Sequence, residues 1–168
     1  MLFRSLLDHK GNPDTRNVNN ESLLFQAYIW QNQWKNLQLL VERGATINEP
    51  NSGGISGPII EIYAEFGAFS NVYWLLQHGA DPSLTYFGDL AKPPFSSKPD
   101  SYTISSIFWY PTKVGYEKWQ EECQIWLLKN GYERPPISDS YRKMRQNFGF
   151  AIDEKYVPLP DISKGEMP

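Results

Sequence analysis

A pair of apolar residues followed by a short polar turn occurs four times along the chain. The pairs are Leu6-Leu7, Leu40-Val41, Leu75-Leu76 and Leu127-Leu128, and the turns lead to Gly11, Gly44, Gly79 and Gly131. The pairs start 34, 35 and 52 residues apart. Glycine adopts left-handed backbone conformations without a steric penalty and therefore often ends a helix. The recurrence predicts repeated helices that each end in the same kind of turn.

Shorter apolar stretches at helical spacing precede two of these endings. They cover residues 23–28 and 59–64, and a short break follows each stretch, at Asn32 and at Gly67. Each repeat is therefore predicted to hold an inner and an outer helix. Units of this kind cannot bury their apolar faces alone, so we expect an all-α stack.

Two helix endings resemble those of a known repeat family. The segments Arg43-Gly44-Ala45-Thr46-Ile47-Asn48 and Gln77-His78-Gly79-Ala80-Asp81-Pro82 are similar to the His-Gly-Ala-Asp-Val-Asn ending of ankyrin repeats. The resemblance covers residues 1–134. It implies an ankyrin-like solenoid of about three helix-turn-helix repeats with an N-terminal half repeat. The inner-helix starts depart from the family, because Glu21-Ser22-Leu23-Leu24 and Ser56-Gly57-Pro58-Ile59 replace its Thr-Pro-Leu-His motif.

The longer third interval contains an insertion at residues 84–100. Pro93, Pro94 and Pro99 exclude a long helix there. In ankyrin-like stacks the loops between units project as fingers, so the resemblance implies an extended finger bearing aromatic residues. A flexible insertion without contacts is the alternative.

Residues 135–168 are predicted to form a C-terminal cap and an extended tail. After Pro135-Pro136, a short helix is expected from Tyr141 to Asn147, with Gly149 closing it. Its Tyr141, Met144 and Phe148 should pack inward, and Arg142, Lys143 and Arg145 should form a solvated face. In the preceding outer helix, expected over residues 116–130, the side chains of Trp119, Cys123, Trp126 and Leu127 share one face and are interpreted as core.

Composition fits one folded domain in the cytoplasm. The 168 residues are 40% hydrophobic and 15% aromatic, which is ample for a packed core. No stretch approaches the length of about 18 apolar residues that a membrane span requires, and we expect no membrane association. The single cysteine, Cys123, excludes an internal disulfide and is interpreted as structural rather than nucleophilic.

Negative charge is concentrated in the middle of the chain. The net charge is only −3, but no lysine or arginine occurs between Arg43 and Lys92. The acidic residues of this stretch are Glu49, Glu61, Glu65, Asp81 and Asp89. A negative groove would attract a basic partner and repel nucleic acid. An ordinary solvated acidic surface remains the alternative.

Motifs for catalysis, cofactors and metals are not found. His9 and His78 both precede a helix end, where ankyrin units commonly carry a histidine for packing and capping. The glycine-rich segment 51–57 lacks the Gly-Lys-Ser/Thr ending of a phosphate-binding loop. Glu61 and Glu65 lie four residues apart, but glycosidases place such carboxylates in a closed cleft on a different scaffold. We therefore expect no enzyme activity, no cofactor and no metal.

Contact residues are carried over from the family's concave face and fingers. They are Trp30, Gln31, Glu49, Asn51, Glu61, Glu65, Phe66, Tyr86, Phe87 and Asp89. Trp30 and Phe66 have the character of interface anchors. A shift of one residue in the helix would instead place either of them in the core.

The favoured function is an inhibitor or immunity protein that neutralises a toxin or enzyme through an acidic and aromatic concave face. This function follows from family analogy, because small degenerate ankyrin proteins occur in bacterial toxin–immunity systems. An adaptor that holds two proteins is the alternative. An enzyme hidden in the insertion and tail is a third, less favoured reading.

Overall fold

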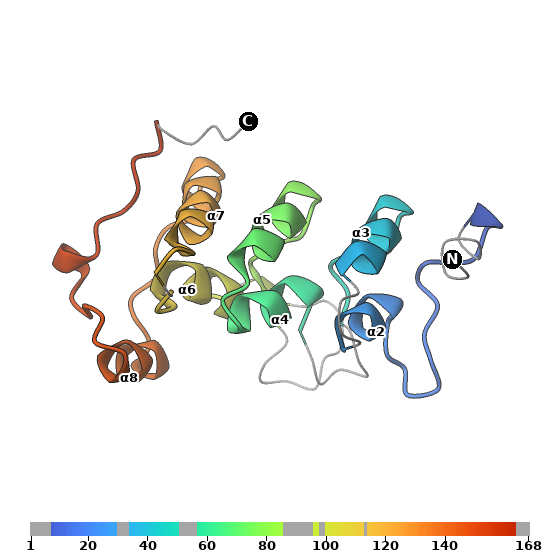
Figure 1. The fold of residues 1–168 in the computed structure, drawn as a ribbon, viewed down its shortest axis with the longest axis horizontal. Coiled ribbons are helices and arrows are strands. Elements are labelled where there is room, and N and C mark those ends of the chain that lie inside the picture. The colour runs from blue at the N-terminus through green and yellow to red at the C-terminus, as the bar shows by residue number, and fades with distance from the viewer. Residues whose placement is uncertain are drawn as a thin grey trace. The chain divides into compact units, whose positions relative to one another are not determined.

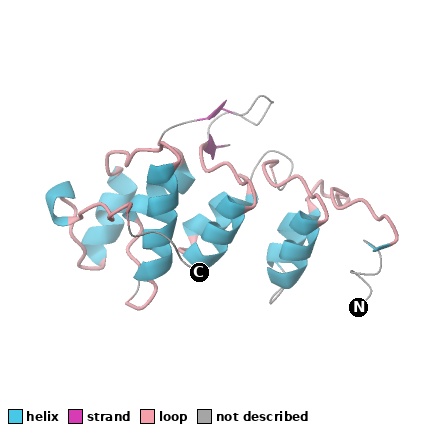
Figure 2. Cartoon of the chain, turned by 90° about the horizontal axis from the view of Figure 1, so that it is seen from above, coloured by secondary structure: helices cyan, strands magenta, loops and turns pink. Residues whose placement is uncertain are grey.

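The computed structural model describes residues 8–29, 34–50, 57–85, 96–97, 100–112 and 114–163, and this part of the chain is mainly helical (Figure 1). The α-helices are α2 (Leu23–Ile29), α3 (Trp34–Glu42), α4 (Ile59–Glu65), α5 (Phe69–Gln77), α6 (Tyr102–Trp109), α7 (Glu117–Lys129) and α8 (Asp139–Asn147), and Glu154–Tyr156 form a 3-10 turn. A pair of two-residue strands, β1 (Leu84–Thr85) and β2 (Ser96–Ser97), is the one sheet in the described residues (Figure 2). The predicted all-α class is confirmed.

The chain divides into two compact units. The first comprises residues 1–59 and 86–96, and the second comprises residues 60–85 and 97–168. Residues after 134, which the sequence assigns to a separate cap and tail, belong to the second unit together with α5, α6 and α7. None of the described helices has the length and apolar character needed to cross a bilayer.

The first unit is built around the helical hairpin of α2 and α3. Leu24 and Ala27 of α2 and Leu37 and Leu40 of α3 are buried, and the two helices pack against each other. Their spacings of three residues place each pair on one helical face, so the apolar stripe of each helix forms this contact. The break predicted at Asn32 lies outside the described residues.

The second unit has a continuous core of α5, α6, α7 and α8. Helix α7 contacts α5 and α6, and α6 also contacts α8 (Figure 1). Phe69, Ile107 and Trp109 are almost completely buried. The predicted inward face of α7 is confirmed for Cys123 and Leu127, which are fully buried, whereas Trp119 and Trp126 are only half-buried.

Five of the described helices end in the same left-handed glycine turn. The glycines are Gly44, Gly67, Gly79, Gly131 and Gly149, with φ between +67° and +90°. In every case the glycine N–H donates to the carbonyl three residues earlier, and the next N–H donates to the carbonyl five residues earlier. These bonds satisfy carbonyls that the helix leaves unpaired. The helix endings predicted at Gly44, Gly79, Gly131 and Gly149 are therefore confirmed.

The fifth predicted ending, near the N-terminus, differs by one residue. Lys10, not Gly11, has the left-handed conformation, with φ of +66°. Counted from the apolar pair, Lys10 stands where Gly44 stands in the next ending, so the assignment of Gly11 as the turn residue is wrong. Leu6 and Leu7 themselves lie outside the described residues.

Arg145 joins the segment after α7 to the end of α6 through a hydrogen bond. Arg145 is only 6% exposed, and its guanidinium donates to the carbonyl oxygens of Trp109 at 3.1 Å and Ala151 at 2.6 Å. The Trp109 indole N–H in turn donates to the Pro135 carbonyl at 2.8 Å. The sequence interpretation that placed Arg145 on a solvated face is wrong, because the side chain is buried and its guanidinium donates to these two carbonyls. Phe148, expected to point inward, is 70% exposed.

Candidate functional site

The structure describes four of the ten predicted contact residues. These are Glu49 in the first unit and Glu61, Glu65 and Phe66 in the second. The other six, Trp30, Gln31, Asn51, Tyr86, Phe87 and Asp89, lie outside the described residues.

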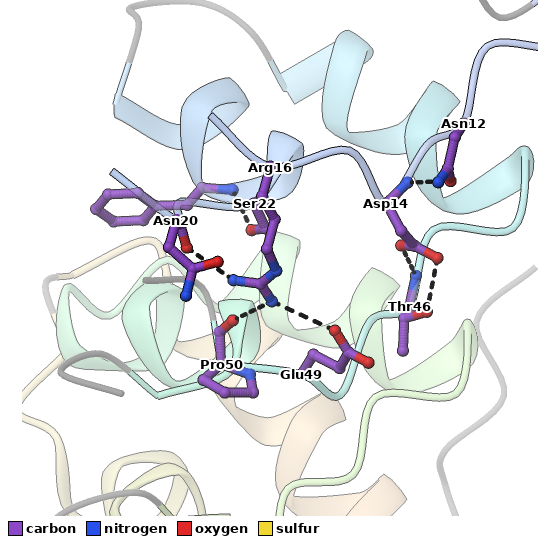
Figure 3. Close-up of polar contacts among 9 residues, drawn as sticks. Asn12, Asp14, Arg16, Asn20, Ser22, Thr46, Glu49 and Pro50 are labelled. Atoms are coloured by element: carbon purple, nitrogen blue, oxygen red, sulfur yellow. Dashed lines mark hydrogen bonds and ion pairs between the residues drawn. The ribbon is translucent and has the colours of Figure 1, made fainter. Parts of the chain in front are cut away.

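Glu49 belongs to a polar network that joins two loops of the first unit (Figure 3). Arg16 donates to the carboxylate of Glu49 at 3.3 Å, to the Pro50 carbonyl at 2.8 Å and to the Asn20 carbonyl at 2.9 Å. The negative charge of Glu49 is therefore balanced by an arginine from outside the stretch of residues 44–91 that lacks basic residues. An exposed pair of this kind contributes little stability, but it lowers the charge that Glu49 can offer to a partner.

Asp14 holds the same two loops together through a threonine. Its carboxylate accepts hydrogen bonds from the Thr46 backbone N–H at 2.6 Å and from the Thr46 hydroxyl at 2.8 Å (Figure 3). The side chain of Asn12 accepts from the Asp14 backbone N–H at 2.9 Å. These bonds give the loop before Glu49 a defined position.

The two carboxylates of α4 have different environments. Glu65 is exposed, whereas Glu61 is only 3% exposed, and its Oε2 has no hydrogen-bond partner among the described residues. Burial, with a smaller contribution from the nearby Glu65 carboxylate, raises the pKa of Glu61 to about 7. Glu61 thus differs from the exposed acidic contact expected from the sequence, and its charge is only partly present at neutral pH.

Glu61 is buried because of its place on the helix. Ile60 and Ala64 are both fully buried, and Glu61 lies beside Ile60 and three residues before Ala64 on the same face. The phenols of Tyr102 and Tyr141, whose ring centroids are 6.0 Å apart, belong to the same part of the unit. Burial raises the pKa of both phenols, so they stay protonated at neutral pH.

An open cavity of about 530 Å³ lies in the second unit, and we call it the aromatic pocket. Three segments form it: the break between α4 and α5 with the first turn of α5, the loop between α6 and α7 with the start of α7, and the turn after α8. Its lining residues are Phe66, Gly67, Ala68, Phe69, Ser70, Asn71, Tyr110, Pro111, Thr112, Tyr116, Trp119, Phe148 and Phe150. Its volume lies in the usual range for small-ligand sites.

Exposed aromatic rings dominate the pocket. Phe66, Tyr116 and Phe148 are 62%, 63% and 70% exposed, and Phe150 is 38% exposed. Singly exposed apolar residues are ordinary, but several around one cavity mark an interaction site. The pocket is therefore a candidate binding surface.

A glycine allows one wall of the pocket to form. Gly67 ends α4 with φ of +67°, and a Cβ atom at this position would collide with the Tyr110 ring. The Gly67 N–H donates to the Ala64 carbonyl at 3.1 Å, which confirms the break predicted at this residue. Tyr110 also meets Phe69 edge to face at a centroid distance of 5.8 Å.

Among the exposed rings of the pocket, Phe66 alone had been predicted from the sequence as a contact residue. Tyr110 and Tyr116 flank the turn at Pro111 and Gly115, and Phe148 and Phe150 flank Gly149. An aromatic residue beside a turn residue is a weak signal of exposure, since a turn lies at the surface. That signal alone does not show that the three segments meet.

Potential metal ligands do not cluster in the described part of the chain. No three histidine, cysteine, aspartate or glutamate side chains there are placed to hold a metal ion. Cys123 is fully buried, and burial raises the pKa of its thiol well above the ordinary value, so it is not a reactive thiolate. His78 stacks on Trp74 at a centroid distance of 3.6 Å, in line with a packing role.

Comparison with known proteins adds no family assignment. No protein-family model, curated protein or solved structure matches this chain.

Proposed function

We propose that the chain is a non-catalytic protein-binding module of stacked ankyrin-like repeats that inhibits a toxin or enzyme. The observation that carries this proposal is a recurring helix end, in which an apolar pair is followed four residues after its start by a left-handed glycine, at Gly44, Gly79 and Gly131, with the same backbone hydrogen bonds each time. Helix pairs that end alike are the building units of helical repeat proteins, whose usual role is to present a binding surface. The proposal places the protein in the cytoplasm, in keeping with its single free cysteine.

The end of α4 is the best-supported described part of the proposed contact surface. Glu65 is exposed and Phe66 is 62% exposed, so one supplies negative charge and the other an apolar ring. A partner with a basic surface fits this combination, because opposite charges guide association and an aromatic anchor slows dissociation. Glu61 is not part of this surface, since it is buried.

The test uses the product of the gene adjacent to the one that encodes this chain. That product is expressed alone and together with the chain, and its effect on growth is measured. Rescue of growth, with a one-to-one complex by light scattering, supports inhibition. Toxicity that the chain does not relieve refutes it.

Matched variants locate the contact. The double variant Glu65→Lys/Phe66→Ser should lose rescue, whereas Tyr156→Ser should retain it, since Tyr156 is exposed and remote in sequence from α4. Simultaneous binding of two different proteins without inhibition would favour the adaptor alternative.

A further inference from the structure

We propose that the aromatic pocket receives an uncharged apolar side chain, which a protein partner inserts as an anchor. This inference rests on the proposed binding function and assigns the chemistry of one contact in it. The main anchor site would then lie in the aromatic pocket instead of on the predicted concave face and fingers. Phe66 is the one residue that the pocket shares with the predicted contact residues.

The lack of charged side chains in the pocket favours an uncharged occupant. The lining residues of the pocket carry no acidic or basic side chain. An ammonium, guanidinium or carboxylate group would lose hydration there without meeting an opposite charge, which is costly. The Arg145 guanidinium already lies 5.4 Å from the Phe150 ring centroid, so its positive charge further disfavours a second cation at this ring.

Exposed ring surface supplies the driving force. The pocket presents Phe66, Tyr116 and Phe148, each more than half exposed, around a cavity that can admit a large side chain. Removal of facing apolar surfaces from water favours association roughly in proportion to the area covered. Hot spots of protein interfaces are typically aromatic or apolar anchors that fill such pockets.

Several rings of the pocket are held before any partner arrives. Tyr110 packs edge to face on Phe69, and Trp119 lies 5.9 Å from Tyr73 between ring centroids. Arg145 holds the turn that carries Phe150 through its bond to the Ala151 carbonyl. A pre-arranged wall loses little conformational entropy on binding, so more of the burial contributes to affinity.

Blocked amino acids test the chemistry of the pocket without the partner. N-acetyl-tryptophanamide and N-acetyl-argininamide are titrated separately into ¹⁵N-labelled protein, and the indole N–H signals are followed by NMR. The tryptophan derivative should shift the Trp119 signal in a saturable way. The Trp109 signal is an internal control, because this residue is buried and its N–H is bonded to Pro135.

Exposed rings provide matched variants. Phe148→Ser should lower the affinity for the tryptophan derivative by about tenfold. Tyr156→Ser should leave this affinity unchanged, since Tyr156 is 69% exposed but does not line the pocket. Phe66→Ser repeats the test from a different segment if Phe148→Ser fails to fold, as judged by circular dichroism. The same pocket variants, Phe148→Ser and Phe66→Ser, should lower the affinity for the protein partner by about tenfold or more.

Three results would overturn the inference. They are no response of Trp119 to either compound, an equal or stronger response to the arginine derivative, and unchanged partner affinity in both pocket variants. The last result leaves the proposed inhibition intact, but it also removes Phe66 from the proposed contact surface. A chain that suppresses no toxin or enzyme refutes the proposed function instead, and the probe titration still reports what the pocket accepts.

Discussion

Replacing Glu61 with glutamine should remove a pH-dependent loss of stability. Burial of the Glu61 carboxyl raises its pKa from 4.5 to about 7, so the folded protein binds this proton more tightly than the unfolded chain does. Between these two pH values the folded state holds more protons, and the free energy of unfolding therefore falls as pH rises. Glutamine resembles the protonated carboxyl in shape and has no proton to lose.

The size of the effect follows from the shift. A pKa of about 7 against 4.5 corresponds to at most roughly 3.5 kcal/mol, at about 1.4 kcal/mol per pH unit. The contribution is fully present below about pH 4.5 and is lost by about pH 7 to 8. Glu65 on the same helix is the acidic group that adds to the rise in the Glu61 pKa, and burial keeps the phenol of Tyr102 and that of neighbouring Tyr141 protonated throughout this range.

Urea unfolding, followed by tryptophan fluorescence, measures the effect from about pH 5 to about pH 8. The difference in unfolding free energy between Glu61→Gln and the native protein should grow in favour of the variant as pH rises, while contributions from all other groups cancel. The control is Glu65→Gln, in which loss of the neighbouring negative charge should lower the Glu61 pKa and reduce the pH dependence. Parallel curves for native protein and Glu61→Gln would refute the argument.

Three further predictions concern turns and charge. Gly79→Ala should cost about 1 kcal/mol from backbone strain alone, and Gly67→Ala should cost more because its Cβ also meets the Tyr110 ring; equal losses in chemical denaturation would contradict this. Lys10→Gly should raise stability by up to about 1 kcal/mol, and an unchanged or lower urea midpoint would refute a strained turn at this residue. Association with the proposed basic partner should slow as salt rises, and less so in Glu65→Lys; stopped-flow rates that stay constant with salt would remove the electrostatic contribution.

Helix ends were predictable because their determinants are local. The turns at Gly44, Gly79, Gly131 and Gly149 depend on a glycine and on carbonyls within five residues, all of which the sequence displays side by side. The same locality explains the error near Lys10. Gly11 was chosen because it is a glycine, but the turn position counted from the apolar pair is that of Lys10. Lysine tolerates the left-handed conformation less well than glycine does.

The charge of the proposed binding surface was harder to predict, because residues far apart in the sequence pair only in the folded protein. The stretch between Arg43 and Lys92 lacks basic residues, but Arg16 reaches Glu49 from 33 positions away. Glu61 loses much of its charge through burial rather than pairing. Its position beside Ile60 and three residues before Ala64 could have revealed this, because an acidic residue within an apolar stripe is drawn into the core with it.

The aromatic pocket could not be derived from the sequence, because its walls come from segments about 80 residues apart. Phe66 and Phe150 become neighbours of one cavity only when the segment after α8 packs within the second unit. The bonds of Arg145 to Trp109 and Ala151 maintain that packing. An occupant that contacts Phe148 or Phe150 therefore binds the packed segment better than a detached one, and mass action requires that it also stabilise the segment. Binding of the proposed partner and the stability of the C-terminal cap should therefore be coupled, through residues that by sequence alone were interpreted as a cap with a solvated basic face.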